Sequence, residues 1–188
     1  MPTLKIYGTI QDQISKLHAS VEKVAKQPGA KLTEVFSALQ RQITESHNVA
    51  FKQLLTGQAL PFFRQNFIEV SANILKLSNC LMKISRLMDT SSHDEKLEQS
   101  CIQVTFDNLE EILLLYLDTW TFLGTDIEKA GAEIGKAIDC IQKLEKHLDS
   151  KMNAAPGNSI RINPYNMLID SLYSTDLSIR KLIVILNI

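Results

Sequence analysis

The sequence has few of the residues that make turns. Seven glycines and five prolines serve 188 residues, about half of the usual share of roughly 12%. A sheet protein needs frequent turns, so this scarcity argues for long helices. Hydrophobic residues still make up 45% and charged residues 22% of the chain, a composition that excludes a disordered or low-complexity protein.

Neither sign of charge dominates the chain. Twenty basic residues stand against twenty-one acidic ones, for a net charge of -1. A protein that neutralises many phosphates normally carries a basic surplus, so nucleic acid is not an expected partner. The charge is nevertheless uneven, with +4 over residues 1–94 and -5 over residues 95–188. We favour an attraction between the two halves of one bundle; the alternative is that each half steers a charged partner.

Cysteine and long apolar runs are also scarce. Cys80, Cys101 and Cys140 are odd in number and widely spaced, which argues against a disulfide framework and a zinc site. Such thiols suit a reducing cytoplasm, where they are small buried groups. The longest purely apolar run, over 112–117, has six residues, whereas a spanning helix needs about 20. We therefore expect a cytoplasmic protein without a transmembrane segment.

The apolar residues recur at helical spacing between the glycines and prolines. The pattern predicts helices over approximately 9–26, 33–56, 61–88, 93–123, 126–152 and 164–187. We expect the segment 4–7 to be irregular or a strand, and 153–163 to be the longest loop. These elements predict an all-α protein: a single-domain antiparallel bundle of five to six helices over residues 1–188.

The third segment has the most regular pattern. Its apolar positions alternate steps of four and three from Phe63 to Met88, which is a heptad seam. We interpret it as the core seam of the bundle. The alternative is a dimeric coiled coil, so a homodimer is possible.

The fourth segment has two apolar stripes. The first comprises Ile102, Phe106, Leu109, Ile112, Leu113, Tyr116, Trp120 and Leu123. The second stripe, well over 100° away around the helix, comprises Leu97, Cys101, Val104, Leu115 and Phe122, and an acidic ridge of Asp107, Glu111 and Asp118 lies between the two. A surface helix needs one apolar stripe. The segment is therefore either central to the fold or in contact with a partner.

Two glycines lie inside the fifth segment. Gly131 and Gly135 form a G-x-x-x-G pattern, and each costs about 1 kcal/mol relative to alanine in a helix interior. We expect close approach of a neighbouring helix, from this chain or from a partner, to compensate.

Signatures of chemistry are missing. Bundles hold di-iron sites through Glu-x-x-His pairs, and the sequence contains none. His18 and Glu22 share a helix face at i, i+4, but no second such pair exists, so surface pairing is the favoured interpretation. His47 with Lys52 lacks the glycine of a phosphotransfer site. Phosphate loops and the nucleophile elbow are also absent. We expect no catalytic residue, metal or cofactor.

These observations favour a non-catalytic protein–protein interaction module, such as an adaptor, a secretion-type chaperone or an effector-like bundle. The expected contact residues are Leu97, Val104, Leu115 and Phe122, rimmed by Asp107, Glu111 and Asp118, and the expected partner is another protein with a basic surface. The alternative is a bundle that binds a lipid or a small apolar ligand between its long helices. An enzyme on a helical scaffold without a known motif is a third hypothesis.

Overall fold

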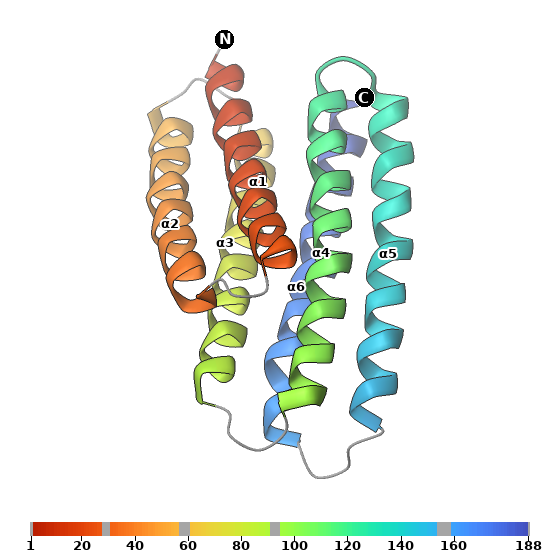
Figure 1. The fold of residues 1–188 in the computed structure, drawn as a ribbon. Coiled ribbons are helices and arrows are strands. Elements are labelled where there is room, and N and C mark those ends of the chain that lie inside the picture. The colour runs from red at the N-terminus through yellow and green to blue at the C-terminus, as the bar shows by residue number, and fades with distance from the viewer. Residues whose placement is uncertain (1, 28–30, 57–60, 91–94, 154–158, 188) are drawn as a thin grey trace.

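The computed structural model describes the backbone of residues 2–27, 31–56, 61–90, 95–153 and 159–187. All secondary structure within these ranges is helical (Figure 1). The helices are α1 (Pro2–Lys26), α2 (Leu32–Thr56), α3 (Pro61–Thr90), α4 (Glu95–Leu123), α5 (Ile127–Asn153) and α6 (Ser159–Leu186). The predicted all-α bundle is confirmed, with six helices in the described part of the chain. None of these helices combines the length and the apolar character needed to cross a bilayer.

Two predicted helix starts are wrong. Residues 4–7 are helical, because α1 begins at Pro2 and its stripe extends outward to the buried Ile6. Helix α6 begins at Ser159, so residues 159–163 of the expected loop are helix and Pro164 lies inside it. Because proline lacks an N–H, this costs α6 one hydrogen bond, to the carbonyl of residue 160. Residues 154–158 lie outside the described part.

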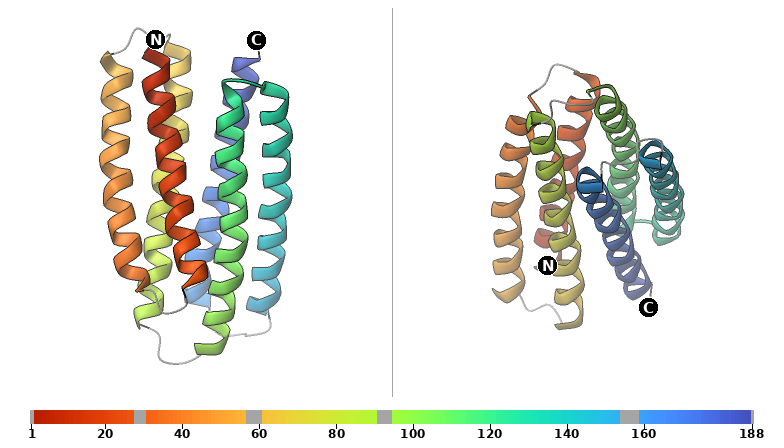
Figure 2. Two further views of the ribbon diagram at one scale, coloured as in Figure 1. Left: turned by 45° about the horizontal axis from the view of Figure 1, so that its top comes forward. Right: turned by 90° about the horizontal axis from the view of Figure 1, so that it is seen from below.

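The helices form two groups of three that pack side by side, α1–α3 and α4–α6 (Figure 1). Chain neighbours are antiparallel, and the order around the bundle is α1, α2, α3, α6, α5, α4 and back to α1. Figure 2 shows the same arrangement from two further directions. The groups therefore meet along two seams, α1 against α4 and α3 against α6.

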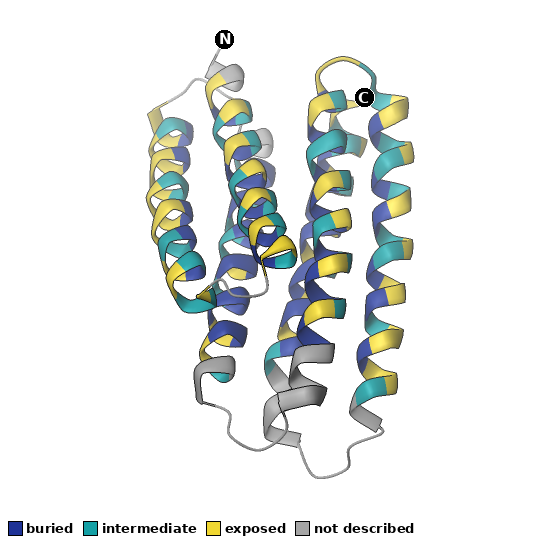
Figure 3. Cartoon of the chain, in the orientation of Figure 1, coloured by how far each residue is buried: buried dark blue, intermediate teal, exposed yellow. Residues whose placement is uncertain are grey.

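The core lies where the predicted stripes face one another. Every residue of the first α4 stripe is buried, with Trp120 fully enclosed. The α3 seam from Phe67 to Ile84 is also buried, which confirms its interpretation as a core seam for the described side chains. Figure 3 shows buried positions on the inward sides of the helices. Phe36 of α2 stacks on Phe106 of α4 at a centroid distance of 5.6 Å, so the two groups share one core.

The two glycines of α5 do not mediate a close helix contact. A Cβ atom added at Gly131 or Gly135 would meet no heavy atom within 4 Å. The expectation of close approach within this chain is therefore wrong. The N-terminus of the same helix is conventional, since the Lys129 amide donates to Asp126 Oδ1 at 3.2 Å, a capping bond.

The ion pair described between the two halves does not follow their net charges. Lys181 of α6 lies 3.1 Å from Glu69 of α3, so here the base comes from the acidic half. The other described ion pairs, such as Lys16 with Asp12 and Lys136 with Glu133, join residues three or four positions apart in the sequence. The attraction between the halves stays a prediction.

Candidate functional site

The second stripe of α4 lies along the edge of the core. Val104, Leu115 and Phe122 are each half-buried and pack against buried core residues. Cys101, in the same stripe, is buried. The side chain of Leu97 lies outside the described part. The stripe is therefore partly covered, and part of its apolar surface remains accessible.

Helix α5 covers one side of this stripe. The Lys129 ammonium lies 5.6 Å from the centre of the Phe122 ring, a distance at which the cation and the ring attract. Further down, Glu111 lies beside Cys140 of α5. Burial and the Glu111 carboxylate together raise the pKa of the Cys140 thiol, so this cysteine stays a neutral thiol. The contact with α5 explains why the second stripe is partly buried.

The acidic ridge remains accessible. Asp107 and Glu111 are exposed and Asp118 is half-buried. Gln103 donates a hydrogen bond of 2.9 Å to Asp107 Oδ1, and Glu111 lies beside Cys140. The ridge thus keeps the charge that a basic partner would meet.

A second apolar surface, which the sequence reasoning missed, lies on α6. We name it the α6 seam. Its members are Met167, Asp170, Ser174, Leu177, Lys181 and Val184, all exposed and spaced alternately by three and four residues. Leu177 is 54% exposed and Val184 is 64% exposed, so two large apolar side chains seven residues apart on one helix face solvent.

The signal for this seam was present but ambiguous. Helix α6 carries apolar residues around most of its circumference, so periodicity alone did not identify the face that points outward. Leu172 and Ile179 are buried, whereas Ile183 is half-buried and Leu186 is 41% exposed. The alternative stripe through Leu177 and Val184 is the one left in solvent.

An open groove runs beside the α6 seam, where α6 meets α3. It has a volume of about 430 Å³ and is lined by Asn66, Leu177, Arg180, Lys181, Val184 and Ile185. Its walls are mainly apolar, with the basic groups of Arg180 and Lys181 in the lining. The groove can accept an apolar side chain presented by a partner.

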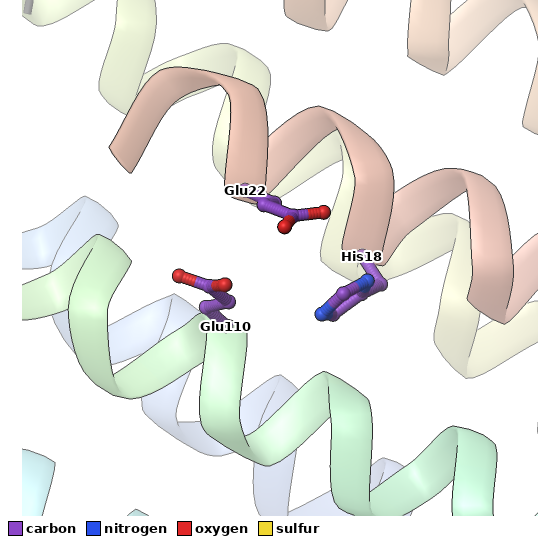
Figure 4. Close-up of side chains that lie close together, drawn as sticks. All are labelled: His18, Glu22 and Glu110. Carbon is purple, nitrogen blue, oxygen red and sulfur yellow. The ribbon is translucent and has the colours of Figure 1, made fainter. Parts of the chain in front are cut away.

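A third group of functional side chains joins α1 to α4. His18 and Glu22 come from α1, Glu110 comes from α4, and the three point toward one another (Figure 4). One donor atom of each lies within 4.8 Å of the other two. The spacing predicted that His18 and Glu22 share a face of the helix, but nothing in the sequence could place Glu110 opposite them.

Two buried polar clusters lie inside the bundle. His47 Nδ1 lies 2.8 Å from Ser71 Oγ, and the Ser71 hydroxyl donates to Gln13 Oε1 at 3.1 Å. Burial lowers the pKa of His47. Ser71 is fully buried, so it is not placed to attack a substrate, and we interpret this cluster as a structural link among α1, α2 and α3.

The second polar cluster holds α6 against α4 and α5. Arg180 donates to Asp176 Oδ2 at 2.6 Å and to the carbonyl of Ile134 at 3.2 Å. The buried Tyr116 hydroxyl donates to the Leu172 carbonyl at 3.0 Å. Asp176 is 2% exposed and its Oδ1 has no hydrogen-bond partner. Burial raises its pKa, although Arg180 opposes the change.

Comparison of the chain with protein-family models, with characterised proteins and with solved structures finds no match.

Proposed function

We propose that this protein is a non-catalytic protein–protein interaction module and that the α6 seam is its principal contact surface. The observation that carries the proposal is the exposure of Leu177 and Val184 seven residues apart on one helix. A helix that repeats apolar residues at this spacing outside the core can pair with a second helix. The partner that fits is thus an amphipathic helix.

The charges of the α6 seam restrict that partner further. Asp170 lies toward one end of the seam and Lys181 toward the other. A matching helix carries a base opposite Asp170 and an acid opposite Lys181. The bond between Lys181 and Glu69 is exposed on both sides, and such pairs contribute only about 0–1 kcal/mol. Lys181 can therefore exchange Glu69 for an acidic group of the partner at little cost.

A second copy of the chain satisfies the same pattern. When two seams lie antiparallel, Asp170 of one faces Lys181 of the other, and Met167 faces Val184. Such an arrangement is self-complementary, as twofold symmetry requires. A homodimer is therefore one form that the proposed interaction can take, although through α6 rather than through the buried seam of α3.

The acidic ridge of α4 forms the second part of the proposal. Asp107 and Glu111 suit a partner with a basic surface, and the rims of Val104, Leu115 and Phe122 would supply apolar contact. Charges at the edge of an interface mainly increase the rate of association and its dependence on salt. We assign the ridge a steering role and the α6 seam the larger share of affinity. The three cysteines form no disulfide with one another, which is in keeping with a cytoplasmic setting for this module.

The groove beside α6 also gives some support to the apolar-ligand alternative. Its lining residues Leu177, Val184 and Ile185 would contact an alkyl chain, and Arg180 and Lys181 would meet an anionic head group. A ligand site normally buries most of its ligand, whereas this groove is open along its length. We therefore prefer a partner side chain as its occupant.

The test combines partner identification with reconstitution. Proteins captured from the native host are identified, purified singly and titrated against the wild type and against the double variant Leu177→Glu, Val184→Glu. We expect the double variant to weaken binding at least tenfold, which corresponds to about 1.4 kcal/mol. Leu55→Glu, at a 61% exposed leucine of α2, is the matched control and should not alter binding.

Other results would redirect or overturn the proposal. If Glu111→Lys abolishes binding while the α6 double variant does not, the ridge of α4 is the contact surface. If the sedimentation coefficient of the wild type rises with protein concentration and that of the α6 double variant does not, the partner is a second copy of the chain. A lipid retained in native mass spectra and lost in Val184→Glu would replace the proposal with the apolar-ligand alternative.

A further inference from the structure

We propose that His18, Glu22 and Glu110 form a binding site for a divalent transition-metal ion, with Zn²⁺ as the ion to test. The three residues offer one imidazole nitrogen and two carboxylates, which are the donors that Zn²⁺ uses alongside thiolates. Their donor atoms lie within 4.8 Å of one another, and the side chains converge from two helices (Figure 4). This site is independent of the interaction surfaces on α6 and α4.

The spacing of the donors is close to that of a metal site. A tetrahedral ion with ligand bonds of about 2.0–2.1 Å brings its donor atoms to about 3.3 Å from one another. His18 and Glu22 lie one turn apart on the same face of α1, where side chains are neighbours. All three residues are half-buried, and the carboxylates can rotate about their side-chain bonds. Side-chain rotations that move each donor atom by about 1 Å would bring the donors to the spacing of a tetrahedral site.

The imidazole of His18 provides an independent indication of a ligand. Its Nε2 atom is buried and has no hydrogen-bond partner. A buried polar atom without a partner is unfavourable and calls for an explanation such as an ion. A metal ion bound at this nitrogen would satisfy it, since neutral imidazole coordinates through its free lone pair.

Lys26 is the group that competes with the ion. Its ammonium donates to Glu22 Oε1, and the pKa of Lys26 is raised, first by Glu22 and to a smaller extent by Glu110. It therefore acts as the cation near both carboxylates when no metal is bound. Because the Lys26 side chain is 64% exposed, it can swing into solvent when a divalent ion takes its place.

The position of the site gives the ion a consequence for the fold. His18 and Glu22 belong to the α1–α3 group and Glu110 belongs to the α4–α6 group, so the ion would bridge one of the two seams between them. A ligand that binds the folded state alone stabilises it by mass action. At a hundredfold excess over Kd, we expect the melting temperature to rise by about 5–10 °C.

The experiment measures Zn²⁺ binding by calorimetry and the melting temperature with and without ZnCl₂. We expect one ion per chain, and we expect His18→Gln and Glu110→Gln each to weaken binding at least tenfold. Glu111→Gln is the matched control, because it removes the same charge from the next position of α4, beside Cys140 on α5. Lys26→Met should tighten binding, because the competing ammonium is gone.

Circular dichroism of each variant without metal shows whether it is folded like the wild type, and MgCl₂ tests whether charge alone is responsible. The absence of a Zn²⁺-dependent melting shift in the wild type would overturn the proposal. So would a shift that persists in both His18→Gln and Glu110→Gln, since the ion would then be bound elsewhere. Equal stabilisation by Mg²⁺ would exclude coordination by His18.

Discussion

Tyr7 and Trp120 bind each other reciprocally through side chain and backbone. The Trp120 indole N–H donates to the Tyr7 carbonyl at 3.0 Å, and the Tyr7 hydroxyl donates to the Trp120 carbonyl. Their rings stack at a centroid distance of 5.3 Å. This pair joins α1 to α4 near one end of the seam, and His18 and Glu110 face each other further along it.

The reciprocal pair predicts a large effect of Trp120→Phe. The substitution leaves the Tyr7 carbonyl without its donor and opens a cavity at a fully buried position, so we expect a loss of about 2–4 kcal/mol in the free energy of unfolding. Tyr7→Phe removes one bond and keeps the stacking, for about 1 kcal/mol. Urea denaturation measures both. Leu114→Ala, at an exposed position of α4, is the control and should stay within about 0.5 kcal/mol.

The same pair explains one failure of the sequence prediction. Residues 4–7 contain β-branched and aromatic side chains, and local preference did not favour a helix. Tertiary contacts decide otherwise, since the helical conformation buries Ile6 and brings Tyr7 onto Trp120, 113 residues away in sequence. Periodicity revealed the stripes of α3 and α4 because each helix repeats its own pattern. It could not reveal which helices become neighbours.

The candidate sites divide along the same line. The two stripes of α4 followed from spacing alone, and so did the placement of His18 and Glu22 on one face of α1. Whether a stripe is covered depends on the neighbouring helix, and α5 proves to cover the rim of Phe122 through Lys129. Glu110 joined the His18 group through the packing of α1 on α4, which no local pattern encodes. The choice between alternative faces of α6 was also made by packing.

Replacing the glycines of α5 by alanine should stabilise the fold. Because a Cβ atom at Gly131 or Gly135 meets open space, alanine fits at both positions without a clash. We expect Gly131→Ala and Gly135→Ala each to raise the free energy of unfolding by about 0.5–1 kcal/mol. Thermal or urea denaturation checks the result. A loss of partner binding in the stabilised variants would show that this face meets a partner at close range.

We expect His47 to make the free energy of unfolding fall as the pH is lowered. Its pKa is lowered by burial, so below its ordinary value of 6.5 the unfolded chain takes up a proton before the folded chain does. The stability that the neutral imidazole provides is therefore present above pH 6.5 and is lost as the pH falls toward the folded pKa. His47→Gln should reduce this slope in a series of urea denaturations. His147→Gln, at an exposed histidine of α5, is the matched control for the substitution itself.

We expect Asp176 to give the free energy of unfolding a pH dependence of the opposite sign. Burial raises its pKa above the ordinary value of 3.8, against the effect of Arg180, so the folded protein holds the proton to a higher pH than the unfolded chain does. Its favourable contribution is present below pH 3.8 and is lost as the pH rises through the folded pKa. Asp176→Asn stays neutral, and we expect it to gain in stability relative to the wild type as the pH rises above 4. Urea denaturation at several pH values measures the difference, with Asp170→Asn at an exposed position of the same helix as the control for net charge. If the wild type instead becomes more stable relative to Asp176→Asn over this range, the ion pair with Arg180 outweighs the cost of burying the carboxylate.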